Sequence, residues 1–215
     1  AIAVAIAALF LARGFTVLEL LSYDLRFAMR GERPPLQDIL IVTIDESSEQ
    51  PLQQRFPWKR SIHAEFLRKL LPHQPKLILY DVIFQTATEQ AEDQAFADAL
   101  YEAYDAATGI GNIILAQYVS PERLERPLPL FAENAGGTGM INMLLDRDNI
   151  VRSAPLVTQT LDGAATQYHL SLALEAAALC KGGVNKIEFP DRSTTVLSKR
   201  DGEQTTEALR VTAPY

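Results

Sequence analysis

The stretch KLILYDVIF, residues 76–84, decides the fold class of this 215-residue chain. Its apolar side chains follow one another without alternation, which predicts a strand that is buried on both faces of a sheet. ILIVTID at residues 39–45 and NIILAQYV at residues 112–119 have the same character. Strands of this kind are typical of parallel sheets, so we expect the three to form the parallel core of an α/β domain.

Helical patterns separate the three predicted strands, over residues 59–71 and 91–107. The order strand, helix, strand, helix, strand requires crossover connections, and a parallel sheet flanked by helices follows from it. The second half predicts antiparallel additions. We expect a hairpin with its turn at Asp162-Gly163, a helix over residues 168–181, and an edge hairpin after residue 184.

The N-terminus opens with AIAVAIAALFLA, residues 1–12, and remains helical in character to about residue 30. Twelve apolar residues are fewer than the roughly 20 that span a bilayer. Because the run begins at the first residue, we interpret residues 1–30 as a truncated transmembrane helix that continues into a membrane-proximal helix. The alternative is a hydrophobic helix packed on a soluble core. Residues 31–215 would form the α/β domain, whose pattern breaks off at Tyr215.

Leu18, Leu21, Leu25 and Met29 form one apolar stripe along this helix. The stripe must be buried either by the α/β domain of the same chain or by the same helix of a second subunit. We favour the second arrangement, a homodimer through the N-terminal helix.

Composition excludes several classes of protein. The net charge of −7 argues against non-specific nucleic-acid binding, which needs a basic surface. The single cysteine, Cys180, allows neither an internal disulfide nor a cysteine-rich zinc site. The three histidines lack metal-ligand spacing, and neither a phosphate-binding loop nor a GxSxG motif occurs. We therefore predict no catalytic group, no metal and no cofactor.

Two acidic residues stand out in the predicted strands. Asp81 interrupts an apolar run, and Asp45 ends the preceding strand, so both could face a crevice at the carboxyl edge of the sheet, below Trp58 and Arg60. A polar ligand or cation site is one interpretation. The other is a structural network in which Asp81, at least half buried, accepts hydrogen bonds from Arg60, from a helix N-terminus or from backbone amides. Arg152 could also reach an acid of the sheet.

The chain also resembles a known family, the second type of CHASE domain, the cyclase- and histidine-kinase-associated sensory extracellular domain. The resemblance covers about residues 17–180. The matching segments are Tyr23-Asp24-Leu25-Arg26, IVTIDESS (41–48), Phe56-Pro57-Trp58-Lys59-Arg60, Ala64, KLILYDVIF (76–84), Asp93, Gly139-Met-Ile-Asn142, Asp146, Asp148, Val151-Arg152 and Pro155-Leu156.

The resemblance implies a periplasmic or extracellular input domain of a bacterial membrane receptor, itself non-catalytic. In the family, membrane helices and a cytoplasmic adenylate cyclase, histidine kinase or serine/threonine kinase follow. The ligand would be a small molecule or an envelope component. The candidate ligand-binding residues are Asp45, Trp58, Arg60, Asp81, Asp93, Asn142 and Arg152.

Two other functions remain open from the residues alone. One is a metal-assisted hydrolase in which Asp45 and Asp81 hold the cation. The other is a protein-binding assembly module, which predicts a contiguous exposed apolar patch in place of a polar crevice.

Overall fold

A computed structural model describes residues 17–105, 110–120, 123–162, 165–180, 186–188, 190, 194–201 and 204–212. The chain divides into two compact units, residues 1–53 and 54–215, and each is described by itself. The predicted membrane span over residues 1–12 lies outside the described residues.

The described part of the first unit, residues 17–53, contains two helices. Residues 17–30 are helical, which confirms the N-terminal helix, and α2 follows over Glu46–Leu52. Asp45 caps α2, because its side chain accepts a hydrogen bond from the Ser48 amide and the Ser48 side chain accepts one from the Asp45 amide. Within the described part of the chain, every helix falls short of the length and apolarity that crossing a membrane requires.

The predicted strand over residues 39–45 is wrong. This segment has no strand pairing in the structure, and its large apolar side chains are exposed, Leu40 to 83 %. An apolar, β-branched run indicates only that a segment suits a sheet. The strand forms where a partner takes up its backbone N–H and C=O groups, and none does so among the described residues.

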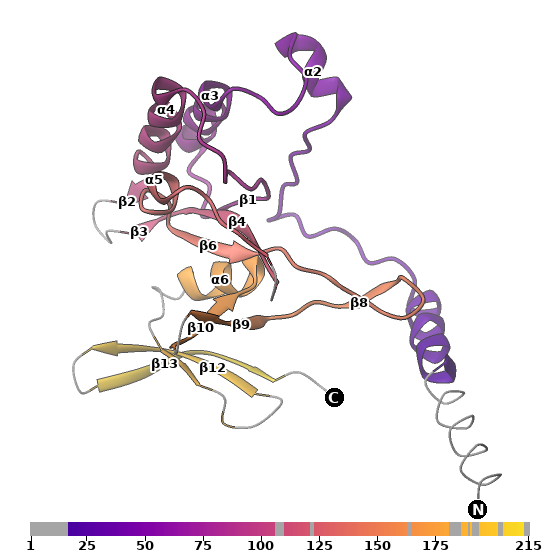
Figure 1. The fold of residues 1–215 in the computed structure, drawn as a ribbon. Coiled ribbons are helices and arrows are strands. Elements are labelled where there is room, and N and C mark those ends of the chain that lie inside the picture. The colour runs from indigo at the N-terminus through magenta and orange to yellow at the C-terminus, as the bar shows by residue number, and fades with distance from the viewer. Residues whose placement is uncertain are drawn as a thin grey trace, which may run out of the picture. The chain divides into compact units, whose positions relative to one another are not determined.

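A mostly parallel sheet forms the centre of the second unit (Figure 1). β4 (Ile113–Val119) pairs in parallel with β1 (Ile78–Tyr80) and with β6 (Gly137–Met140), and its end pairs antiparallel with β5 (Leu124–Glu125). The predicted strand over residues 112–119 is confirmed almost to the residue. The strand predicted over 76–84 is present but shorter than predicted, since β1 covers only Ile78–Tyr80.

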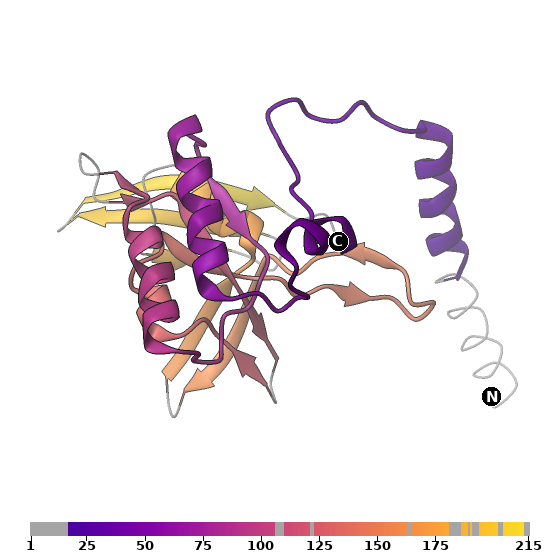
Figure 2. The ribbon, with the colours of Figure 1, turned by 90° about the horizontal axis from the view of Figure 1, so that it is seen from above.

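Helices cover both faces of this sheet. α3 (Arg60–Leu70) and α4 (Gln90–Tyr101) lie side by side on one face (Figure 2). The short η1 (Leu71–His73) directly follows α3, and α5 (Pro129–Ala132) contacts α4. α6 (Leu172–Leu179) lies against the other face. β4 is therefore buried on both sides, which explains its unalternating apolar sequence.

The principal core fills the space between the sheet and the α3–α4 layer. Its largest buried members are aromatic and aliphatic residues from both layers: Leu67, Tyr80, Phe84, Phe96, Leu100, Ile113, Leu115 and Phe131. The phenylalanine rings contact each other edge to face or tilted, with Phe84 and Phe96 centroids 4.6 Å apart.

Antiparallel strands complete the second unit, as the sequence predicts. β9 (Val157–Asp162) and β10 (Ala165–Leu170) form the predicted hairpin, although Gly163 of its turn lies outside the described residues. Helix α6 begins later than predicted, because residues 165–170 pair with β9. The other additions are β2 (Tyr104–Asp105), β3 (Ile110–Gly111), β7 (Leu144–Leu145), β8 (Val151–Ser153), β11 (Lys186–Glu188), β12 (Thr194–Asp201) and β13 (Gln204–Thr212).

The segment Gly139-Met-Ile-Asn142 begins in β6 and contacts both α6 and the end of β4. A Cβ at Gly139 would lie 2.5 Å from the Leu172 Cα, so only glycine lets α6 approach this closely. Met140 is buried. Asn142 accepts a hydrogen bond from the Val119 amide at 3.1 Å and donates to the Val119 carbonyl at 2.6 Å. The motif residues thus have structural roles at the end of the sheet.

Candidate functional site

Of the seven predicted site residues, Arg60 and Asp93 come together inside the α3–α4 layer. Arg60 is 8 % exposed, and its Nε lies 3.6 Å from Asp93 Oδ1. The guanidinium also donates to the Thr86 carbonyl at 3.1 Å and lies 4.6 Å from the centroid of the Phe84 ring. Asp93 accepts hydrogen bonds from the Thr88 amide and hydroxyl. This buried ion pair ties the start of α3 to the start of α4.

Trp58 belongs to the same neighbourhood through His63. The Trp58 indole donates to the Gln54 carbonyl at 3.1 Å, and its ring centroid lies 5.9 Å from that of His63. His63 is 1 % exposed, and its Nδ1 lies 2.7 Å from the Tyr80 hydroxyl. Burial, assisted by the Arg60 charge, lowers the pKa of His63 to about 4. The imidazole is therefore neutral at neutral pH.

The two acids predicted to face one crevice belong to different units. Asp45 lies in the first unit, where hydrogen bonds from Ser47 and Ser48 hold the pKa of its carboxyl below the usual value. Asp81 lies in the second. Our prediction that Asp81 is at least half buried, with Arg60 or backbone amides as hydrogen-bond donors, is wrong, because the residue is exposed one position beyond the end of β1. Because β1 ends at Tyr80, Asp81 keeps its hydration and needs no buried partner.

Asn142 and Arg152 are held by residues near them. Asn142 bonds the Val119 backbone as described above. The Arg152 side chain pairs with two acids of the β7–β8 turn, donating to Asp146 Oδ2 at 2.9 Å and to Asp148 Oδ2 at 2.7 Å. These contacts fix the turn of the hairpin.

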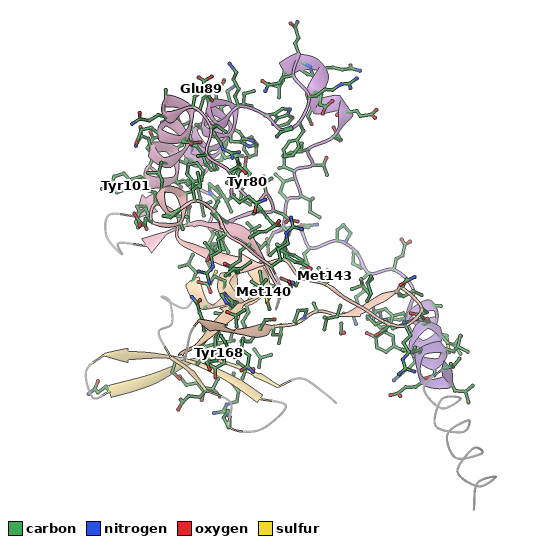
Figure 3. The ribbon with its side chains drawn as sticks, in the orientation of Figure 1. Tyr80, Glu89, Tyr101, Met140, Met143 and Tyr168 are labelled. Carbon is green, nitrogen blue, oxygen red and sulfur yellow. The ribbon has the colours of Figure 1, made fainter. Side chains whose placement is uncertain are left out.

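A cavity of about 690 Å³ lies elsewhere in the second unit, and none of the seven predicted residues lines it. We call it the α5–β10 cavity. Its walls come from β4, the segment before and through α5, β6, β10, α6 and β11. The residues that line it are Gln117, Arg126, Pro127, Pro129, Ala132, Glu133, Thr138, Gln167, Tyr168, His169, Leu170, Glu175 and Ile187. Figure 3 shows Tyr168 on the β10 side of the sheet, away from the Tyr80 side that α3 and α4 cover.

Two polar side chains inside this cavity have no hydrogen-bond partner among the described residues. Gln117 is 4 % exposed, and Glu175 is mostly covered. Burial raises the pKa of the Glu175 carboxyl, since no donor nearby offsets the lost hydration. Neither side chain is among the fully buried atoms without a partner, which in the described residues are Arg60 Nε and Asn112 Oδ1. Both line the cavity, where a bound molecule or water can meet them.

Local structure fixes Glu175 in place. Ser171 caps α6 by accepting a hydrogen bond from the Leu174 amide at 3.2 Å, and Ser171 itself pairs with Met140 of β6. Glu175 follows in the first turn of the helix. A Cβ at Gly137 would lie 2.9 Å from Glu175 Oε1, so this glycine leaves room for the carboxyl group against β6.

The rim of the α5–β10 cavity carries a positive charge, opposite to that of the Glu175 carboxylate. Arg126 is exposed and donates to Gln167 Oε1 at 2.7 Å. Next to it, buried His169 forms a 2.8 Å hydrogen bond with the Thr160 hydroxyl. Burial and the Arg126 charge lower the pKa of His169, so its imidazole contributes no positive charge at neutral pH. The wall thus combines one guanidinium with the carboxyls of Glu133 and Glu175.

Sequence reasoning missed this cavity because its lining residues are spread over seventy positions and follow no motif. The only local signal was Glu175, an acid in the otherwise apolar helix LALEAAAL. In the part of the chain that the structure describes, His, Cys, Asp and Glu never gather in the groups of three that could hold a metal ion.

Comparison with known proteins gives one match. The family model described as the CHASE2 domain matches residues 1–213. No curated protein and no solved structure matches the chain.

Proposed function

Because the chain belongs to the CHASE2 domain family, whose members are extracellular sensory domains of signalling receptors, we propose that it is the input domain of a bacterial membrane-bound receptor. The receptor would carry a cytoplasmic adenylate cyclase, histidine kinase or serine/threonine kinase. The family match over residues 1–213 carries this proposal. The family is non-catalytic, and the domain itself would bind a ligand without transforming it.

We propose the α5–β10 cavity as the ligand site of this sensor. Its volume of about 690 Å³ falls in the range of small-molecule sites, roughly 300–1,000 Å³. Its lining combines apolar side chains with several polar and charged ones, and such groups fix the orientation of a bound small molecule. The seven residues predicted from the sequence are less suited, since Arg60, Asp93, Asn142 and Arg152 are already engaged in the contacts that hold the fold.

Signalling would be a population shift between two packed states of the receptor. A ligand changes that equilibrium only by binding one state better than the other. We propose that the helix over residues 17–30 transmits the change to the membrane, and that it pairs with the same helix of a second subunit through Leu18, Leu21, Leu25 and Met29. All four side chains are exposed, Leu21 to 59 %, which leaves the stripe available to a second copy.

The location of the domain tests the proposed function. Alkaline phosphatase fused after Tyr215 in the natural reading frame should be active, because this enzyme works only after export. Green fluorescent protein fused at the same position should stay dark, because it does not become fluorescent when it is exported unfolded. Fluorescence together with an inactive phosphatase would place the domain in the cytoplasm and refute the receptor proposal.

One observation favours the second candidate function, a protein-binding module. The β7–β8 hairpin and Met143, which directly precedes it (Figure 3), expose a set of apolar side chains: Met143, Leu144, Leu145, Ile150 and Val151. Exposed apolar groups of this kind mark protein interaction sites. If the hairpin binds a protein partner, Leu144→Asp should abolish capture of that partner by the receptor in cross-linked membranes, whereas the exposed substitution Tyr101→Asp should not.

A further inference from the structure

The residues that line the α5–β10 cavity include a mostly buried acid, Glu175, and an exposed base, Arg126, and these two define the ligand chemistry. Glu175 has no hydrogen-bond partner among the described residues, so its carboxyl group is available to a donor. The ligand group that best compensates a desolvated carboxylate is a cation with several N–H donors, and an ammonium group is the smallest of these.

Arg126 defines the other end of the ligand. Its bond to Gln167 uses one of the five N–H donors of the guanidinium. The remaining donors suit a carboxylate, which guanidinium groups bind through two parallel hydrogen bonds. A ligand with a carboxylate at Arg126 and an ammonium at Glu175 would satisfy both groups at once.

Between the two charged residues the cavity offers neutral hydrogen-bonding groups. The Gln117 side chain lines the cavity from β4, and the Thr138 side chain lines it from the neighbouring strand β6. A glutamine amide, with two N–H donors and a carbonyl acceptor, would bind a peptide group. Pro127, Leu170 and Ile187 provide apolar walls that would cover small side chains.

We propose that the α5–β10 cavity binds a zwitterionic molecule of amino-acid or short-peptide size, with its ammonium group on Glu175 and its carboxylate on Arg126. A cavity of about 690 Å³ holds more than one amino acid, so a peptide of two or three residues fits better than a free amino acid. The inference names the ligand class of the sensor and therefore rests on the proposed function.

Calorimetric titration of the purified 215-residue chain with alanine, dialanine and trialanine tests the size of the ligand. Dialanine or trialanine should bind more tightly than alanine. N-acetyl-dialanine lacks the ammonium and dialanine amide lacks the carboxylate, and each should bind about tenfold more weakly or worse. Absence of heat with all three zwitterions at about 10 mM, or equal affinity for the capped and uncapped peptides, would overturn the proposal.

Substitutions assign each end of the peptide. Glu175→Gln should bind dialanine and N-acetyl-dialanine equally weakly, and Arg126→Gln should lose the preference for dialanine over its amide. Glu89→Gln and Arg68→Gln are matched controls, because both residues are exposed on the α3–α4 layer and outside the cavity (Glu89 is labelled in Figure 3). Both controls should bind like the wild type. If the Glu175 and Arg126 variants retain both preferences, the assignment is refuted.

The two proposals fail separately. If the phosphatase fusion is not exported, the receptor proposal is refuted, while peptide binding by the purified chain can still be measured. Conversely, an exported domain that ignores every peptide refutes the ligand class alone. Should Glu175→Gln fail to fold, the comparison of capped and uncapped peptides on the wild-type chain still decides the proposal.

Discussion

The Nε atom of Arg60 lies 3.6 Å from the Oδ1 atom of Asp93, inside the layer where α3 and α4 meet the sheet. This distance is an ion pair without a direct hydrogen bond, and the Arg60 Nε has no hydrogen-bond partner among the described residues. Because both side chains are about nine-tenths buried, little water is available to screen the charge that remains when one partner is removed.

Arg60→Met should therefore destabilise the second unit strongly. The methionine keeps most of the apolar stem, while Asp93 loses its cationic partner in a buried place, which costs about 3 kcal/mol. Arg68→Gln is the matched control. Its partner Glu102 is half exposed, and such pairs contribute less than about 1 kcal/mol. Urea unfolding of both variants measures the difference, and equal losses would show that the Arg60 pair is effectively solvated.

His63 predicts how stability depends on pH. Its pKa of about 4 in the folded chain lies below the usual 6.5, so the unfolded chain binds a proton that the folded chain does not. Stability from this group is fully present above pH 6.5 and is lost as the pH falls from 6.5 to 4, by roughly 3 kcal/mol in total.

Urea unfolding between pH 7 and pH 4.5 checks this prediction. The free energy of unfolding of the wild type should fall more steeply toward acid than that of His63→Leu, which cannot titrate at this position. His73→Gln removes an exposed imidazole and should follow the wild type. Parallel curves for the wild type and His63→Leu would show that His63 is hydrated in the folded chain.

Replacing a glycine of β6 by alanine should destabilise the fold by an amount that depends on which atoms the new methyl group contacts. In Gly139→Ala the Cβ would lie 2.5 Å from the Leu172 Cα, and backbone must move, at a cost of about 1–3 kcal/mol. In Gly137→Ala the Cβ would meet the movable end of Glu175, so the loss should be smaller. Thermal melting should rank Gly139→Ala below Gly137→Ala, and the reverse order would mean that Glu175 is the more rigid neighbour.

Local periodicity explains which elements could be predicted from the sequence. The helix predicted over residues 59–71 is α3, and the strand predicted over 112–119 is β4, since each pattern depends on neighbouring residues and on a core that buries them. The same information was insufficient for residues 39–45, because pairing needs a partner edge that no local pattern specifies. Asp81 was misplaced because β1 ends at Tyr80, four residues before the predicted end at residue 84.

The candidate site could not be predicted for a related reason. Glu175 and Gln117 lie 58 positions apart and come together only because α6 packs on a sheet of which β4 is the central strand. An acid in an apolar helix and a glutamine in an apolar strand each look like isolated exceptions. Their significance appears when the fold places both in the wall of one cavity.

The N-terminal helix carries the last prediction, which concerns the proposed dimer. At 100° per residue, Leu18, Leu21, Leu25 and Met29 share one face, whereas Tyr23, Phe27 and Arg30 lie on the opposite face. On the opposite face the side chains contact each other within the helix: the Tyr23 and Phe27 ring centroids lie 4.8 Å apart, and the Arg30 guanidinium lies 4.3 Å from the Phe27 centroid. The leucine face has no such internal partner among the described residues.

Disulfide cross-linking in membranes, with Cys180→Ser as background, distinguishes the two faces. Leu21→Cys lies at the centre of the leucine face and should give a covalent dimer on oxidation. Glu19→Cys, two residues earlier and about 160° away around the helix axis, should cross-link poorly. Leu21→Cys should also react more slowly with a water-soluble maleimide, because a packed interface excludes the reagent. Equal cross-linking at both positions, or none at either, would remove the helix pair and leave the leucine face to be buried by another surface of the receptor.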